Sequence, residues 1–106
     1  MAGEVIVLIT VSSADEATKI GTALVNEHLA ACVNVVPEIR SLFFWEGKTR
    51  DEYETLLICK SRQELLDKLI LRVKSLHSYA VPEILALPIV GGSSDYITWM
   101  WEATKG

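Results

Sequence analysis

A histidine, a tyrosine and a glutamate lie close together in the segment HSYAVPE, residues 77–83. The imidazole of His77 and the carboxylate of Glu83 are both competent ligands for Cu(II) or Zn(II). Pro82 stiffens the segment and favours extended geometry at Val81, so these side chains are expected on a rigid turn. The segment is therefore a candidate metal-binding turn.

A structural role competes with metal binding at this turn. Two ligands do not make a strong metal site, and no third ligand follows at a recognisable spacing. His77 comes directly after a predicted helix, where an imidazolium stabilises the negative end of the helix dipole. From spacing alone the helix-end role is the commoner explanation, and metal ligation remains the alternative.

Other motifs that could indicate phosphate binding, metal binding or catalysis have simpler explanations. The sequence GKT at 47–49 matches the end of a phosphate-binding loop, but the glycine required five positions before Gly47 is replaced by Leu42. Cys32 and Cys59 are too far apart for a C-x-x-C motif, which favours two small buried side chains. No pair of nucleophile and base is recognisable, so we do not expect an enzyme.

The composition limits the classes of partner. A net charge of −4 argues against a nucleic-acid binder, which normally carries a basic surface. No apolar run approaches the roughly 20 residues that cross a bilayer, and Glu4 stands where a secretion signal carries positive charge. We therefore expect a cytoplasmic protein that binds neither nucleic acid nor membrane.

The chain is also unusually apolar for its length. Hydrophobic residues make up 50% of its 106 residues, and the mean hydropathy is +0.28. The length predicts one domain, residues 1–106. A monomer of this size has difficulty hiding so much apolar surface, which favours an oligomer.

Hydrophobic periodicity predicts four strands and three helices. Strands are expected at 4–11, 32–47, 52–60 and 84–92, and helices at about 14–31, at 65–76 and within 93–106. The first strand is continuously apolar, which predicts burial on both faces. The pairs Ser13–Glu16 and Ser61–Glu64 have the spacing of a helix capping box, and Ser93 or Ser94 is expected to cap the last helix.

The order β-α-β-β-α-β-α predicts an α+β fold of the ferredoxin-like type, with a four-stranded antiparallel sheet and an extra C-terminal helix. This topology places the second and fourth strands at the edges of the sheet. Pro37 and Pro88 fall in those two strands, and proline is tolerated at edges because it cannot donate a ladder hydrogen bond. The positions of the prolines therefore support the assignment.

Several motifs follow one another at consistent separations over nearly the whole chain: LAACVN, WEGK, DEYE, LICK, HSYAVPEI and LPIVGGSSDYITW. Together they resemble the CutA1 family, the divalent-cation tolerance proteins. The resemblance implies a ferredoxin-like fold in a tight homotrimer built like the PII signalling proteins. Family members are associated with tolerance to copper and other divalent ions, and some bind copper.

Carried onto this chain, the resemblance implies His77 and Glu83 as metal ligands, and Cys32, Trp45, Lys60 and Tyr79 as residues of a cleft between subunits. Two departures weaken metal ligation. Leu76 stands where some members have a second histidine, and LITVSS at 8–13 lacks the cysteine that some members carry late in the first strand.

The expected function is a trimeric cytosolic protein of the divalent-cation (copper) tolerance type, which binds Cu(II) or another divalent cation weakly in the intersubunit cleft. The alternative is a PII-like regulatory sensor that binds a small anionic metabolite at the subunit interface. In the alternative, Lys60 supplies the positive charge.

Overall fold

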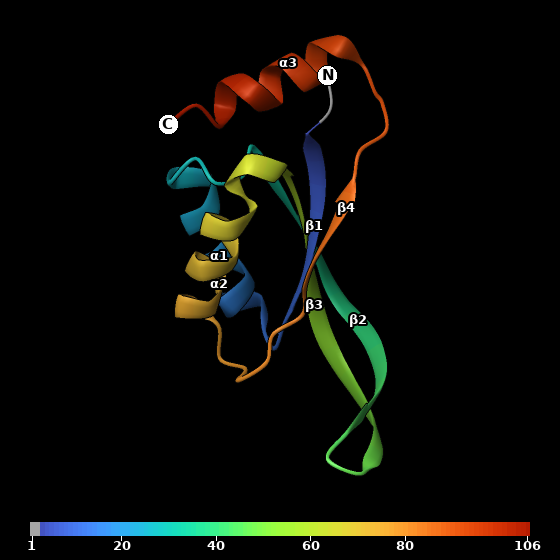
Figure 1. Cartoon of the computed structure of the whole chain (residues 1–106). Helices are drawn as coiled ribbons and strands as arrows, with labels where there is room; N and C mark the ends of the chain where they lie inside the picture. Colours follow the sequence, from blue (N-terminus) through green and yellow to red (C-terminus); the bar gives the residue numbers. More distant parts are fainter. Residues whose placement is uncertain (1–2) are drawn as a thin grey trace.

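The computed structural model describes residues 3–106, which form one four-stranded antiparallel sheet with the order β2-β3-β1-β4 (Figure 1). The strands are β1 (Glu4–Val11), β2 (Cys32–Trp45), β3 (Lys48–Arg62) and β4 (Ile84–Pro88). The helices are α1 (Ala14–Asn26), α2 (Leu66–Leu76) and α3 (Ser94–Ala103), with a short 3-10 helix at Gln63–Leu65. The predicted ferredoxin-like α+β fold is confirmed, with β2 and β4 at the edges.

The helices α1 and α2 cover one face of the sheet, and the core lies between these two layers (Figure 1). Successive side chains of a strand point to opposite faces, so alternate residues of β1 and β3 enter this core. Side chains that are 0% exposed come from both layers: Val7, Ile9, Leu57 and Cys59 from the sheet, and Ile20, Leu24, Leu69 and Val73 from the helices.

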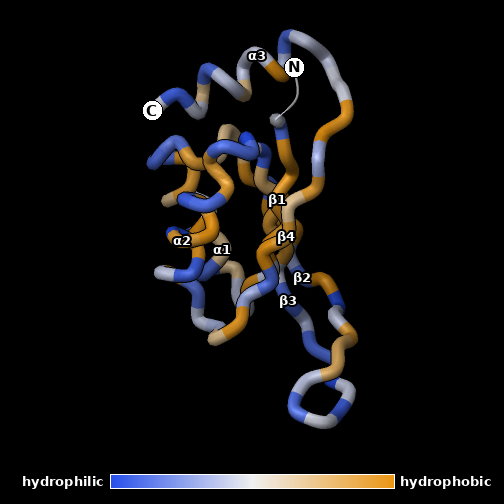
Figure 2. The backbone as a smooth tube through the Cα atoms, in the orientation of Figure 1, coloured by the Kyte–Doolittle hydropathy of each residue, from blue (hydrophilic) through white to orange (hydrophobic). Residues whose placement is uncertain are grey.

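The opposite face of the sheet is apolar but has no covering layer among residues 3–106. We call it the open sheet face; it is formed by Ile6, Leu8, Leu56, Ile58, Leu85 and Leu87. Figure 2 shows hydrophobic residues running along β1 and β4. The prediction that the first strand is buried on both faces is therefore wrong for the single chain, because right-handed crossovers place α1 and α2 on the same side.

The two longest strands, β2 and β3, form a hairpin that projects beyond the helices (Figure 1). The turn consists of Glu46 and Gly47, both with positive φ, at 51° and 82°. The hairpin accounts for the elongated shape, with extents of 44 × 25 × 23 Å. The turn was expected over 47–51, but it contains only residues 46 and 47, because β3 already begins at Lys48.

An irregularity interrupts the pairing of β2 at the predicted proline. Val36 pairs with Leu56 and Ile39 with Glu54, so two residues of β2 oppose one residue of β3. Glu38 has a φ of 58°, in the left-handed region that non-glycine residues rarely adopt. This is a β-bulge, and it places Pro37 where the missing N–H breaks no ladder hydrogen bond.

Two elements end earlier than the sequence predicts. The helix α1 ends at Asn26 rather than near Ala31, because His28 adopts a φ of 60° and the chain reverses. The strand β4 ends at Pro88 rather than at Gly92. The residues freed after β4 form an irregular loop that leads to α3.

The C-terminal helix α3 crosses the end of the sheet at which β1 begins (Figure 1). Arg62, the last residue of β3, donates to the hydroxyl of Thr104 at 2.8 Å and to its carbonyl at 3.0 Å. The same guanidinium stacks on the indole of Trp101 at 4.3 Å from the ring centroid. No helix formed by residues 3–106 has the length and apolar character needed to cross a membrane.

The two predicted capping boxes have different outcomes. Ser13 is the N-cap of α1, and its hydroxyl accepts from the N–H of Glu16 at 3.1 Å. The reciprocal bond of the box differs, because the Glu16 carboxylate accepts from the N–H of Ser12 and not from that of Ser13. The second prediction is wrong: Ser61 lies in β3, is 0% exposed, and donates to the carbonyl of Leu29 at 2.6 Å. Because β3 continues past Ser61, the Ser61 hydroxyl does not cap a helix but binds the connection between α1 and β2.

We expect Ser13→Ala to lower the free energy of unfolding by about 1 kcal/mol, because the N–H of Glu16 loses its cap. Ser93 is a matched control, since it is the N-cap of α3 but makes no side-chain cap hydrogen bond. Ser93→Ala should change stability by less than about 0.5 kcal/mol. Urea unfolding curves measure both, and equal losses would contradict this difference between the caps.

Candidate functional site

The turn after α2 is held by the imidazole of His77, whose side chain is 0% exposed. Its Nδ1 lies 3.0 Å from the backbone N of Tyr79, and its Nε2 lies 2.7 Å from the carbonyl oxygen of Thr10. Because the N–H of Tyr79 donates to Nδ1, the ring proton resides on Nε2, which donates to Thr10. The neutral ring thus uses both nitrogens to join the turn to β1.

Glu16, in the first turn of α1, completes this junction. Its carboxylate accepts from the backbone N–H and hydroxyl of Ser78 at 2.7 and 3.0 Å, and from the same groups of Ser12 at 3.2 and 2.8 Å. Burial raises the pKa of Glu16, but the hydrogen bonds from Ser78 and Ser12 outweigh burial and hold the pKa below its ordinary value. The ionised carboxylate lies 3.6 Å from Nδ1 of His77.

Tyr79 connects the same turn to β3. Its hydroxyl donates to Oε2 of Glu54 at 2.8 Å, and Glu54 is 9% exposed. Burial, together with the hydrogen bond and charge of Glu54, raises the pKa of Tyr79, so the phenol remains a donor at neutral pH. The ring also packs against His77, with centroids 4.7 Å apart. The turn is therefore stabilised from three elements.

Glu83, the second predicted ligand, is exposed just before β4 and makes no hydrogen bond or ion pair with any residue from 3 to 106. The described part of the chain contains no group of three or more His, Cys, Asp or Glu side chains that could hold a metal ion. A ligating nitrogen of His77 would have to give up a hydrogen bond. The residues of a single chain therefore do not fit a metal centre, and ligation by His77 and Glu83 stays a prediction.

Cys32 and Lys60, two of the predicted cleft residues, lie opposite each other on β2 and β3. Nζ of Lys60 is 4.0 Å from Sγ of Cys32 and donates to Oδ1 of Asn34. Tyr96 of α3 also contacts this thiol; burial, then the charge and hydrogen bond of Cys32, raise the pKa of Tyr96. In the described chain Lys60 has no carboxylate ion-pair partner, so its ammonium is available to an anion.

The remaining cysteine and the predicted tryptophan lie apart from that pair. Cys59 is 0% exposed, and burial raises its pKa to about 12, so it is the small neutral core residue that the sequence predicts. Trp45 ends β2 at the tip of the hairpin and is 45% exposed. At about 3.3 Å per strand residue it lies on the order of 40 Å from Cys32. One chain therefore does not bring Trp45 to the other cleft residues.

Comparison with known proteins identifies the family. The model of the CutA1 divalent ion tolerance protein family matches residues 5–103. The chain belongs to the CutA1 family.

A CutA relative from Thermus thermophilus, named a divalent-cation tolerance protein, is 48% identical over 101 residues, which are 95% of this chain and 98% of that protein. Its solved structure superposes with a TM-score of 0.93. The crystal structure of CutA1 from Oryza sativa has a TM-score of 0.94 at 43% identity and covers 97% of this chain and 94% of that one. The sequence resemblance and the CutA1 fold are thus confirmed.

The chloroplastic CutA protein of Arabidopsis thaliana is 46% identical over 101 residues, 95% of this chain. The matching region is 56% of that plant protein, and it is 57% of the chloroplastic CutA 1 of Oryza sativa. The CutA1 chain described here therefore spans little more than half the length of these two relatives.

Sequence analysis missed Thr10, Glu16 and Glu54 as partners of the turn in this CutA1 protein. The Ser13–Glu16 spacing places Glu16 at a helix start, but it does not show that a distant turn also binds there. Nothing in the sequence signals Glu54. Its contact with Tyr79 arises because β1 ends at Val11, which pairs with Thr55, so that the residue of β3 that precedes Thr55 lies beside the turn.

We expect Glu16→Gln to lower the free energy of unfolding at pH 7 by about 1–3 kcal/mol, because charged hydrogen bonds from Ser12 and Ser78 are lost. The pKa of the folded state lies below the ordinary value of 4.5. The stabilisation is therefore present above that pH and is lost as the pH falls through the folded pKa.

Urea unfolding at pH 7 and at about pH 3 tests this sign, because wild type and Glu16→Gln should converge in acid. Asp15→Asn is the matched control, since Asp15 is the exposed acidic neighbour in the same helical turn. It should change stability by no more than about 0.5 kcal/mol. A loss for Glu16→Gln of the same size at both pH values contradicts the role of the ionised carboxylate.

Proposed function

We propose that this chain forms a homotrimer of the divalent-cation tolerance type that resides in the cytoplasm and acts by binding rather than by catalysis. The observation that carries the proposal is the apolar open sheet face, for which residues 3–106 provide no cover. The CutA1 family supports the tolerance role. The two free cysteines support a reducing compartment.

The open sheet face has the composition of a buried surface. In the register of the sheet Leu8 lies between Ile58 and Leu85, and Ile6 lies between Lys60 and Leu87. An antiparallel sheet with one solvated face normally alternates apolar with polar residues, yet here both faces are apolar. Leu85 is 58% exposed and Leu87 50% exposed in the single chain, so burial against other copies would remove apolar area from water.

The sheet edges and the hairpin supply complementary surfaces for such an assembly. The strands β2 and β4 each leave one edge unpaired, and unpaired edges tend to bind another strand. The hairpin carries exposed large side chains: Leu42 at 66%, Phe44 at 72%, Trp45 at 45% and Tyr53 at 67%. A closed ring that joins β2 of one copy to β4 of the next pairs every edge, as the PII-like trimer implies.

Light scattering should give three times the 11.8 kDa chain mass for the wild-type protein. We expect Leu85→Asp to shift this mass toward that of the single chain, because a carboxylate cannot be buried in an apolar interface without a partner. Leu71→Asp is the matched control, since Leu71 is 70% exposed on α2, on the other side of the molecule. If both variants keep the wild-type mass, the open sheet face is not the interface.

Within the proposed trimer, a divalent cation such as Cu(II) would bind weakly at a cleft between subunits. Glu83 is exposed and unpaired within the described chain, so its carboxylate can serve as a ligand without breaking a contact. His77 can serve only after one of its two ring hydrogen bonds breaks. That loss of internal hydrogen bonding reduces the net affinity and supports a weak site.

A second candidate function is a PII-like sensor for a small anionic metabolite, and the ammonium of Lys60 favours it. Lys60 is half-buried on the side of the sheet that carries the open sheet face. Its hydrogen-bond partners in the described chain are the Asn34 amide and the Cys32 thiol, which leave its positive charge uncompensated. An anion at this position would gain a charge-assisted hydrogen bond.

A thermal-shift screen separates the two functions, because a ligand that binds only the folded state raises Tm. If the protein binds Cu(II), the wild type should be stabilised by Cu(II) and Glu83→Gln should not. If it is a sensor, phosphate, citrate or a nucleotide should stabilise the wild type and Glu83→Gln alike, but not Lys60→Gln. Stabilisation of all three proteins by the same ligand would remove both residues from the binding site.

A further inference from the structure

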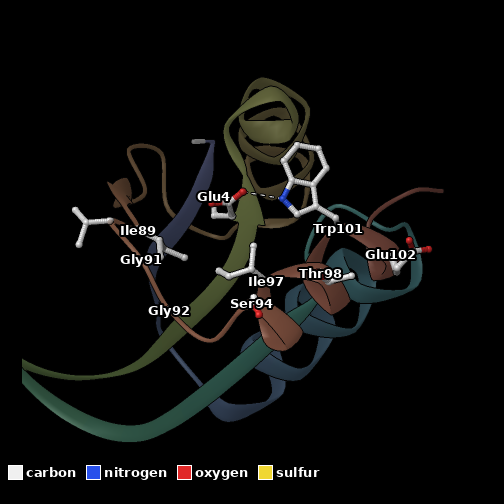
Figure 3. A pocket seen from close by; sticks show the side chains of 10 residues that line it. Glu4, Ile89, Gly91, Gly92, Ser94, Ile97, Thr98, Trp101 and Glu102 are labelled. Carbon is white, nitrogen blue, oxygen red and sulfur yellow. Dashed lines mark hydrogen bonds between the residues drawn. The ribbon is translucent and has the colours of Figure 1, made fainter. Parts of the chain in front are cut away.

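A cavity of about 510 Å³ lies between α3 and the loop that follows β4. The backbone N–H of Ile89 donates to the carbonyl of Glu4 at 3.0 Å, which fixes the start of this loop to β1. In Figure 3 Glu4 and Trp101 lie together at one end of the cavity, and Ile97 points toward them from α3. None of the residues assigned above to a metal or to an intersubunit cleft lines this cavity.

The carboxylate of Glu4 is buried, and it has no ion-pair partner among the described residues. Glu4 is 4% exposed, and its Oε2 accepts from Nε1 of Trp101 at 2.7 Å, which is a neutral donor. Among residues 3–106 no lysine, arginine or histidine forms an ion pair with it. Burying an ionised carboxylate is costly unless a cation pairs with it.

Arg62 is the nearest candidate counter-ion by register, since it pairs with Glu4 across β1 and β3. Its guanidinium is directed elsewhere: it donates to Thr104, forms an ion pair with Glu64, and stacks on Trp101. The positive charge that would balance Glu4 is therefore not supplied by the strand beside it. A cationic group that enters the cavity would supply that charge.

The remaining walls suit an apolar body. The side chains of Ile89 and Ile97 and the indole of Trp101 line the cavity. Gly91 and Gly92 form part of the rim without side chains, and a Cβ added at Gly91 would meet no atom within 4 Å. The volume lies within the range of roughly 300–1,000 Å³ that is typical of small-molecule sites.

We propose that this cavity binds an organic primary ammonium ion with an apolar substituent. The ammonium pairs with the carboxylate of Glu4, and the substituent packs against Ile97, Ile89 and the edge of Trp101. The hydroxyls of Ser94 and Thr98 line the same cavity and offer further acceptors for the three ammonium protons. An anion is disfavoured by Glu4, and a bare metal ion leaves the apolar walls unused.

The test follows the indole N–H signal of Trp101 by ¹H–¹⁵N NMR during titration with n-hexylammonium. Trp101→Phe assigns that signal among the three tryptophans. We expect a saturable shift with a Kd on the order of 1 mM, which is reasonable for a ligand of so few atoms. The neutral n-hexanol and the anionic hexanoate should bind at least about tenfold more weakly, because neither pairs with Glu4.

Glu4→Gln keeps an acceptor for Trp101 and removes the charge, so affinity for n-hexylammonium should fall about tenfold or more. Glu102→Gln is the matched control. Glu102 also lines the cavity, but it is exposed and pairs with Lys105 at 3.3 Å, so its loss should cost less than about threefold.

Gly92→Leu tests the same site without altering charge. A Cβ at Gly92 would meet Ile97 at an ordinary contact distance of 3.7 Å, so the longer side chain fills the cavity and should abolish the shift. The NMR spectrum itself reports whether each variant is folded. The proposal is overturned if the Trp101 signal does not move, if n-hexanol binds as well as n-hexylammonium, or if folded Glu4→Gln or Gly92→Leu binds like wild type.

Discussion

Side chains alternate between the two faces of a strand, and this constraint governs the rest of the structure. In β1 the residues Val7 and Ile9 enter the core under α1 and α2, and the intervening Leu8 must point the other way. Both crossover helices lie on the same side, so an apolar strand interior necessarily produces a second apolar face. The proposed assembly follows from that unequal covering.

The turn that first suggested metal chemistry is a junction between elements. His77, Glu16 and Tyr79 connect the turn after α2 to β1, α1 and β3 through hydrogen bonds. Each polar group there is satisfied by another, which is what makes buried polar networks rigid and specific. Because the polar groups of the turn already have hydrogen-bond partners, the turn binds an ion less readily, since the ion must compete with those partners.

The sequence predicted the elements and their order because periodicity, turns and edge prolines are local signals. It failed where a residue's role depends on distant partners. Ser61 has the spacing of a cap, yet its hydroxyl holds the Leu29 carbonyl across the fold. Cys32 and Lys60 were predicted in one cleft and do lie together, whereas Trp45 lies at the far end of the hairpin. Glu4 was interpreted only as the start of the first strand and as an argument against a secretion signal, because local sequence shows neither its contact with Trp101 nor the cavity.

The bulge at Pro37 and Glu38 sets the phase of everything that follows in β2. Before it, Asn34 and Val36 lie opposite Ile58 and Leu56; after it, the odd-numbered residues take that phase, with Phe43 opposite Arg50. Without the extra residue of the bulge, the same sequence would continue in the first phase, and Phe43 would lie on the side of the sheet that carries α1 and α2. The extra residue at the bulge therefore decides which surface of the hairpin each later side chain of β2 occupies, so the number of residues here matters as much as their types.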